Sequence, residues 1–265
     1  NEATGTTIQD GKELTLIGGK SDGTGTRFTL ADKIISVAGK GAKLILGSLG
    51  VKDSSVYQGQ AEEVQLSNGG ELRIAAGDYL VKNHTSSGGI TTVNSNSTFR
   101  SDKATLTGAT FENNGTTELG SLEGWNGARL TNNKKLTVTG ETQFGGIFTN
   151  NKDATLKGTA HFDGTLVNTQ GANLIANTVN VIGTLENLGY MEALDDSTVY
   201  GTLYNPGEIH LFNTAIGARV DEKGGHIGNT FTLIATGKTQ VAGLISNAAT
   251  GDAQHMEAEG KNPDV

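Results

Sequence analysis

A short stretch recurs six times in the 265-residue chain at an almost constant spacing. The copies read "GATFENNGTTEL", "GARLTNNKKLTV", "GGIFTNNKDATL", "DGTLVNTQGANL", "IGTLENLGYMEA" and "YGTLYNPGEIHL". The sixth residue of each copy is Asn, and successive copies lie 18 or 19 residues apart: Asn113, Asn132, Asn150, Asn168, Asn187 and Asn205. A period this short and regular indicates a chain built from stacked repeats.

Each copy alternates apolar and polar residues, which is the period of a strand with one buried face. An apolar residue lies two positions before each Asn and another lies six positions after it, as Leu166 and Leu174 do around Asn168. The copies lack the i, i+3, i+4, i+7 spacing of a helical repeat. One such unit cannot bury a core alone, but stacked units can. We therefore predict an all-β fold, a right-handed parallel β-helix (β-solenoid) with coils of 18 or 19 residues.

The recurring Asn fits a corner of such a coil. Stacked side-chain amides can bond to one another because each carries a donor and an acceptor. Asn also tolerates the left-handed backbone of sharp turns, and a glycine such as Gly189 or Gly207 follows several copies. We therefore predict that the six Asn form a structural ladder rather than a binding site.

The same spacing predicts how far the ladder extends. Asn94 lies 19 residues before Asn113, and the next site after Asn205 falls at Lys223, where the ladder should end. Before residue 94 the rhythm widens, because Leu14, Leu44 and Leu72 lie 30 and 28 residues apart, with Phe99 following after 27. These distances predict larger coils or coils with outward loops, and the candidate loops are 18–27, 50–60 and 82–89.

This reading divides the chain into four parts. Wider coils with loops and a cap span 1–93, and regular coils span 94–225. The segment 226–247 reads as two antiparallel strands that form a capping hairpin. The rest, 248–265, is a polar tail with a short helix expected around Ala253–Gly260.

The amino-acid composition excludes several classes of function. Gly is frequent, at 39 residues, whereas Pro numbers 2 and charged residues make up 18%, which favours short strands and tight turns. The net charge of −8 and the scattered Lys and Arg argue against nucleic acid as a partner. No long apolar run is present, so we expect no direct membrane insertion. The absence of Cys excludes disulfides, thiol nucleophiles and Cys-bound zinc.

The repeated units "GTLVN", "GTLEN" and "GTLYN", together with the ending "GNTFTLIATGKTQVAGLI" (228–245), resemble a known group. They are similar to the β-helical passengers of Gram-negative autotransporters and of filamentous-haemagglutinin-type exoproteins. The resemblance implies export through the periplasm with an outer-membrane translocator, and an extracellular or cell-surface location. It also implies a non-catalytic adhesin whose partner is a host surface protein, a glycan or another copy of the chain. The start "NEATGTT" fits a chain whose signal was removed or an excised fragment.

The main alternative is a β-helical polysaccharide lyase or hydrolase, including a phage tailspike. Such an enzyme needs carboxylates close together on one face, and hence in the same position of neighbouring coils. The positions aligned with Asp163 in neighbouring coils hold Gly145 and Ile182, and those aligned with Asp153 hold Lys135 and Gly171. In two further pairs the residues are adjacent in sequence, so their side chains cannot both point to one face of a strand: Asp195 with Asp196, and Glu62 with Glu63. We expect Asp195 and Asp196 on an exposed turn. A pair supplied by a wide N-terminal loop stays open.

No histidine pair has the spacing of a metal site. We expect His161 and His210 to face outward, and we expect no cofactor, no metal and no catalytic residue. The five histidines are His84, His161, His210, His226 and His255.

Two groups of residues are candidates for surface binding. Thr165, Thr184 and Thr202 should form a short row beside the buried leucines. Aromatic side chains can stack on sugars, or can simply fill the surface or core: Trp125, Tyr190, Tyr200 and Tyr204. Regular strand faces can also pair with a second rod, and a purely structural spacer remains a further alternative.

Overall fold

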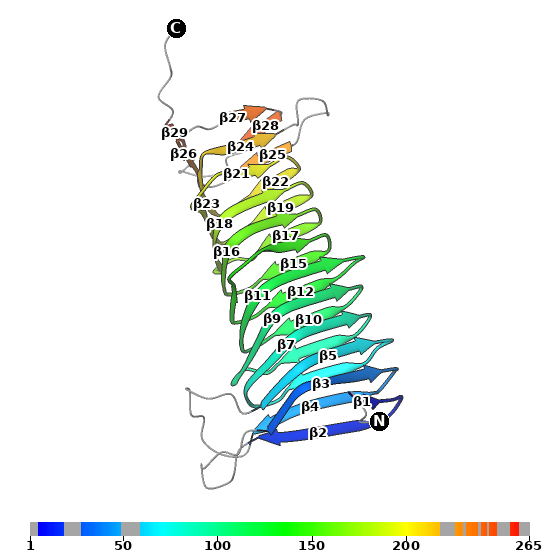
Figure 1. Cartoon of the computed structure of the whole chain (residues 1–265). Coiled ribbons are helices and arrows are strands. Elements are labelled where there is room, and N and C mark those ends of the chain that lie inside the picture. Colours follow the sequence, from blue (N-terminus) through cyan, green and yellow to red (C-terminus); the bar gives the residue numbers. More distant parts are fainter. Residues whose placement is uncertain are drawn as a thin grey trace. The chain divides into compact units, whose positions relative to one another are not determined.

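The computed structural model describes residues 5–18, 28–48, 59–217, 226–229, 232–237, 240–242, 244–247 and 255–259. The chain divides into two compact units, Asn1–Thr139 and Gly140–Val265. Within the described ranges both units consist of strands and turns and contain no helix. Each unit is a stack of parallel coils, so the predicted β-solenoid is confirmed (Figure 1). Its right-handed sense stays a prediction.

In the first unit one sheet supplies one strand to each coil. Its strands pair in parallel in chain order. They are β2 (Glu13–Gly18), β4 (Lys43–Ser48), β6 (Glu71–Ile74), β8 (Ile90–Val93), β10 (Thr110–Asn113) and β12 (Arg129–Asn132).

The strands of the other sheet, most of which are longer, complete these coils and also pair in parallel with their counterparts. They are β1 (Gly5–Ile8), β3 (Phe28–Ala38), β5 (Gly59–Ser67), β7 (Gly77–Ser87), β9 (Ser97–Thr107), β11 (Thr116–Trp125) and β13 (Lys135–Val138). The in–out alternation of β11 slips at Gly120–Ser121, where both residues are half-buried. A Cβ at Gly120 would lie 2.3 Å from the carbonyl oxygen of Asp102, so glycine lets the chain bend there against the preceding coil.

The second unit repeats this plan with more breaks in the long strands. One parallel set comprises β15 (Ile147–Asn150), β17 (Thr165–Asn168), β19 (Thr184–Asn187), β22 (Thr202–Asn205), β25 (His226–Asn229) and β28 (Leu244–Asn247). The other set begins with β14 (Thr142–Phe144), β16 (Asp153–Phe162), β18 (Asn173–Val181), β20 (Tyr190–Ala193) and β21 (Ser197–Val199). It ends with β23 (Glu208–Phe212), β24 (Thr214–Gly217), β26 (Thr232–Thr236), β27 (Gln240–Ala242) and β29 (His255–Glu259).

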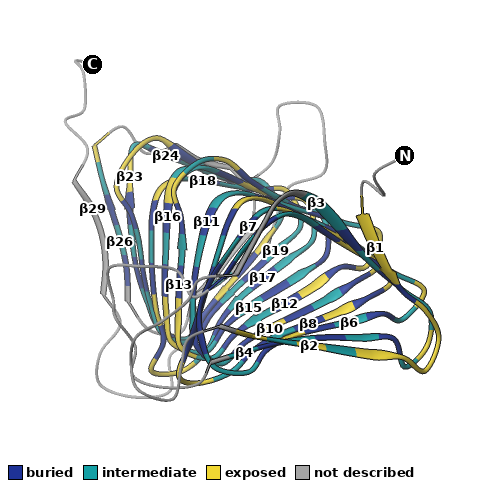
Figure 2. Cartoon of the chain, turned by 60° about the horizontal axis from the view of Figure 1, so that its bottom comes forward, coloured by how far each residue is buried: buried dark blue, intermediate teal, exposed yellow. Residues whose placement is uncertain are grey.

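Alternating burial along the strands creates the core of each unit (Figure 2). In β17, Leu166 and Asn168 are buried while Thr165 and Val167 are half-exposed. Leu166 pairs with Leu185, which pairs with Leu203, so the buried leucines of successive coils lie in one row. Each buried leucine contributes about 2 kcal/mol of hydrophobic stabilisation. No single coil can provide this alone, because each coil contributes one leucine and the others in the row come from its neighbours.

The wide first coils are confirmed, but they end earlier than predicted. Leu14 pairs with Leu44, which pairs with Leu72, as the spacing indicated. Leu72 then pairs with Thr91, only 19 residues on, so the narrow coils begin here. The prediction for Phe99 was wrong, because Phe99 lies in the other sheet and pairs with Tyr79.

Two expectations about the first unit were wrong in register or element type. Asn94 does not extend the Asn ladder, because Asn113 pairs with Val93. The coil from Val93 to Asn113 is one residue longer than the coil from Asn113 to Asn132. Asn94 therefore follows the strand, and its Nδ2 donates to the carbonyl oxygen of Ala75. Residues 82–87 are not an outward loop but belong to β7. Most of the other two candidate loops, 18–27 and 50–60, lies outside the described residues. Gly18 ends β2, and residues 59–60 begin β5, so these residues belong to strands rather than loops.

The end of the second unit also differs from the prediction. The segment 226–247 does not form an antiparallel hairpin, because β25, β26 and β28 pair in parallel with neighbouring coils. Asn205 pairs with Asn229, and Asn229 pairs with Asn247, so the Asn register resumes after a coil of 24 residues instead of ending near Lys223. Residues 255–259 form β29 and pair with β26, where a short helix was expected.

Candidate functional site

The predicted Asn residues lie at one corner of the coils and are fully buried. In the first unit, Nδ2 of Asn113 donates to Oδ1 of Asn132 at 2.7 Å. In the second unit the same bond links each Asn to the next at 2.7 to 2.9 Å: Asn150 to Asn168, Asn168 to Asn187, and Asn187 to Asn205. The ladder is therefore internal and offers no atoms to a ligand.

The ladder also holds the backbone of the surface next to it. Nδ2 of Asn168 donates to the carbonyl oxygen of Tyr190 at 2.8 Å, and Nδ2 of Asn187 donates to that of Glu208 at 2.9 Å. Tyr190 is the first residue of β20, and Glu208 is the first residue of β23. Since buried amide bonds fix these strand starts, the side chains of Tyr190 and Glu208 project from a rigid frame.

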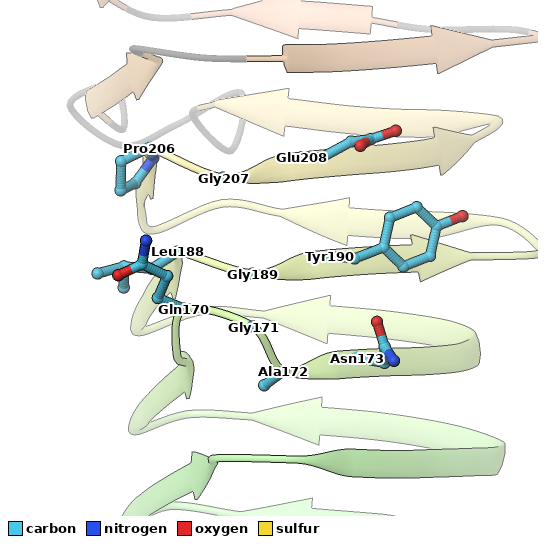
Figure 3. Close-up of a pocket in the computed structure, with 10 residues that line it drawn as sticks. All are labelled: Gln170, Gly171, Ala172, Asn173, Leu188, Gly189, Tyr190, Pro206, Gly207 and Glu208. Atoms are coloured by element: carbon cyan, nitrogen blue, oxygen red, sulfur yellow. The ribbon is translucent and has the colours of Figure 1, made fainter.

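A hollow of about 420 Å³ lies just outside this corner in the second unit. Two rows of side chains from three successive coils form its walls: Gln170, Leu188 and Pro206 on one side, and Asn173, Tyr190 and Glu208 on the other (Figure 3). Between the walls lie Gly171, Gly189 and Gly207, with Ala172 beside them. We call this hollow the corner trough.

Glycine shapes the floor of the corner trough. A Cβ on Gly189 would lie 2.4 Å from the carbonyl oxygen of Ala172, and one on Gly207 would lie 2.3 Å from that of Gly189. Gly171 has a φ of +75°, which side chains other than Asn and Asp rarely adopt. The turns can therefore stack closely only without side chains, and this leaves the space between the two walls open.

Tyr190 is the centre of a polar cluster on the outer face. Its hydroxyl donates to Oε2 of Glu192 at 3.2 Å, and its ring lies 5.3 Å from the ring of His210, centroid to centroid. Nε2 of His210 lies 2.6 Å from Oε1 of Glu208. We call these four residues the Tyr190 cluster. Desolvation and the negative charges of Glu192 and Glu208 raise the pKa of Tyr190, so its hydroxyl stays protonated and can act as a donor.

Sequence reasoning singled out Tyr190 but missed the rest of the wall. Asp153 pairs with Asn173, Asn173 with Tyr190, and Tyr190 with Glu208. The predicted neighbour of Asp153, Gly171, was wrong because the turn after Asn168 is two residues longer than the turn after Asn187. The same insertion displaces Leu174, so that Ala176 rather than Leu174 pairs with Leu156.

The acidic residues singled out from the sequence are exposed or bonded to neighbouring side chains. Asp195 and Asp196 lie on an exposed turn, and Asp163 is exposed at the end of β16. Glu62 lies 2.6 Å from Nζ of Lys82, and Glu63 accepts a hydrogen bond from Gln65. Among the described residues no group of three or more His, Asp or Glu side chains could hold a metal ion.

Two carboxylates that sequence reasoning missed meet at Arg100 in the first unit. Nη1 of Arg100 lies 2.5 Å from Oδ2 of Asp78, and Nε lies 2.7 Å from Oε2 of Glu118. Partial burial lowers the pKa of Arg100, but Glu118 and Asp78 outweigh burial and the net pKa is raised. The guanidinium occupies the space between the carboxylates, which makes this an ion-paired structural cluster.

His84 is the one described histidine that points into a core. It is fully buried, and its Nε2 lies 2.8 Å from Oγ1 of Thr91. Its ring contacts Phe99 and Phe111 edge-on, and its Nδ1 has no hydrogen-bond partner within the described part of the chain. Burial lowers the pKa of His84 to about 4, opposed weakly by the backbone of Val64, so the ring is neutral at pH 7. His161 is exposed and His210 half-exposed; the side chains of His226 and His255 lie outside the described ones.

The other surface candidates are separate from the corner trough. Thr165 pairs with Thr184 and Thr184 with Thr202, so this row exists as predicted. Tyr204 projects from the same sheet and is 44% exposed. Tyr200 and Trp125 are half-buried, the latter in the first unit.

Comparison with protein-family models, with curated proteins and with solved structures finds no match to this chain. The search of the described residues for membrane-crossing helices gives no segment with the required length and apolar character.

Proposed function

We propose that this protein is a non-catalytic attachment protein, a passenger of the autotransporter or filamentous-haemagglutinin type displayed on a Gram-negative cell surface. Export would pass through the periplasm and use an outer-membrane translocator. On this proposal the stacked coils form a rigid scaffold, and side chains on its outer faces bind a host surface protein, a glycan or a second copy of the chain. Attachment then depends on many weak contacts made at once.

The observation that carries this proposal is the regular outer surface next to the buried ladder. At one corner of the second unit, successive coils place Asn173, Tyr190 and Glu208 in one row on a frame fixed by buried amides. Rows of polar and aromatic side chains suit binding without chemistry. Outside the Tyr190 cluster, Glu62 is bound to Lys82, and Asp78 and Glu118 are bound to Arg100.

A bead assay tests the proposal. Beads carrying the purified chain at graded densities are exposed to epithelial cells, to immobilised glycans and to each other, with uncoated beads as the control. We expect attachment or clumping that rises more steeply than the density of the chain, because several contacts must form together. If the beads attach to none of these surfaces and do not clump, the proposal is contradicted and the structural spacer is left.

The enzyme alternative has its own test. The chain is incubated with plant, bacterial and host polysaccharides, and new reducing ends and unsaturated products are measured. We expect no product. A product that disappears on replacing Glu208 or Glu192 with the corresponding amide would contradict the non-catalytic proposal.

A further inference from the structure

We propose that the corner trough is a binding site for a neutral oligosaccharide, which would lie along the stack and pack against the ring of Tyr190. This inference rests on the proposed attachment function and assigns it a site and a ligand class. The ligand is a chain of at least two uncharged sugar units, because the trough crosses three coils and strand spacing is about 4.8 Å per coil.

The shape of the corner trough suits a ligand of this kind. Its volume of about 420 Å³ lies within the usual range for small-molecule sites. The floor of Gly171, Gly189 and Gly207 lets a sugar ring approach the backbone, while Leu188 and Pro206 form an apolar edge (Figure 3). The opposite wall carries the Tyr190 ring between Asn173 and Glu208. A sugar ring can place its C–H face on the aromatic side chain and its hydroxyls on the polar groups at either side.

The polar groups of the walls match sugar hydroxyls. Gln170 and Asn173 each supply an amide with both a donor and an acceptor, and the carboxylate of Glu208 accepts. A hydroxyl group can donate and accept, so it can pair with all three. Lys and Arg are absent from the described lining, whereas Glu208 lines it and Glu192 lies beside Tyr190. This acidic setting repels sialylated or sulfated glycans and selects a neutral one.

The frame behind the wall is preorganised. The carbonyl oxygens of Tyr190 and Glu208 are held by Asn168 and Asn187 of the buried ladder. Because the wall is already ordered without a ligand, little conformational entropy is lost on binding. The ladder, although buried, thus supports the site.

The experiment uses the whole chain on an array of neutral, sialylated and sulfated oligosaccharides, followed by calorimetric titration with the neutral oligosaccharide that gives the strongest signal. The variants are Tyr190→Ala, which removes the ring, and Tyr190→Phe, which keeps it. Tyr204→Ala is the matched control, because Tyr204 is a half-exposed tyrosine outside the trough. Circular dichroism melting of each variant checks that the fold is retained.

We expect the parent chain to bind neutral oligosaccharides. Tyr190→Ala should weaken binding at least about tenfold, whereas Tyr190→Phe should bind within about threefold of the parent chain. Tyr204→Ala should bind as the parent chain does. Binding that survives Tyr190→Ala, that is lost in Tyr204→Ala, or that is confined to anionic glycans would overturn the trough as the site. Attachment of coated beads without any oligosaccharide binding would overturn the trough and leave the attachment proposal. Absence of both would overturn both.

Discussion

Asn168 and Asn187 lie one coil apart, and Nδ2 of Asn168 donates a 2.8 Å hydrogen bond to Oδ1 of Asn187. Both side chains are fully buried. The same Nδ2 also satisfies the carbonyl oxygen of Tyr190. One amide therefore joins two coils and holds the start of the strand that forms a wall of the corner trough.

Replacing Asn168 with Ala should lower the free energy of unfolding by about 2–4 kcal/mol, because the buried carbonyl of Tyr190 and the amides of Asn150 and Asn187 lose partners. Urea denaturation followed by circular dichroism measures the change. The control is Asn177→Ala, since Asn177 is exposed and makes one bond to the carbonyl of Lys157. It should cost less than about 1 kcal/mol. Equal losses in the two variants would show that the ladder has no special role.

Glycine at the start of each "GTL" unit should be required for close approach of the coils. A Cβ on Gly183 would lie 1.9 Å from the carbonyl oxygen of Gly164, in the preceding coil. Gly183→Ala should therefore destabilise the chain by about 3 kcal/mol or more, through strain between the two backbones. Gly47→Ala is the control, because its nearest contact would be an ordinary 3.9 Å. Thermal melting of both variants measures the difference, and a harmless Gly183→Ala would refute the close stacking.

His84 should make the protein sensitive to acid. Its pKa is lowered from 6.5 to about 4 in the folded chain, so below pH 6.5 the unfolded state binds the proton more readily. The resulting loss of stability begins near pH 6.5, grows as the pH falls, and stops growing below about pH 4, where it reaches about 3 kcal/mol. At pH 7 the contribution is absent.

The measurement is the urea midpoint between pH 7 and pH 4 for the parent chain and for His84→Leu. The variant should lose less stability over this range, because it lacks the buried imidazole. His161→Leu removes an exposed histidine and should retain the parent pH dependence. Parallel pH curves for the parent and His84→Leu would mean that His84 does not titrate as described.

Arg100 should stabilise the first unit more than an ordinary surface cation. Arg100→Gln leaves Asp78, which is 3% exposed, beside a neutral group, and should cost about 2–3 kcal/mol. Lys103→Gln removes an exposed partner of Glu123 and should cost less than about 1 kcal/mol. Denaturation at low and high salt measures both losses. Equal small losses would place the Arg100 cluster among ordinary surface ion pairs.

The solenoid, its corner and the rows of buried leucines were predictable from the repeat. Each coil places the same residue type at the same inward position or corner, so that residue type recurs in the sequence once per coil. Errors arose where a coil gained residues. Two additional residues after Asn168 moved Asp153 opposite Asn173, and one additional residue before Asn113 put Val93, not Asn94, in register. A fixed spacing cannot show such insertions, since strand pairing absorbs them at the turns.

The C-terminal error and the position of His84 have other causes. Strands of 226–247 have the same apolar alternation whether they pair in parallel or antiparallel, so their composition did not decide between a hairpin and further coils. His84 was assigned to a loop because its neighbours are polar, but Ser86 and Thr91 are buried with it. The corner trough was not predictable as a site, because its walls combine residues from three coils and its floor depends on glycine stacking.

The most direct test of the account is whether stacked coils have the described register. The chain contains no native Cys, so any disulfide that forms must join the introduced residues. Thr184 and Thr202 pair across neighbouring coils, which places their Cα atoms about 4.8 Å apart, within disulfide range. Thr184 and Tyr204 are offset by two residues, about 8 Å apart and out of range. Under mild oxidation at low concentration, we predict that the Thr184→Cys/Thr202→Cys chain closes an internal disulfide and the Thr184→Cys/Tyr204→Cys chain stays reduced, as measured by mass spectrometry of cleaved peptides. Preferential closure of the second pair, or of neither, would contradict the stacked coil on which the ladder and the corner trough depend.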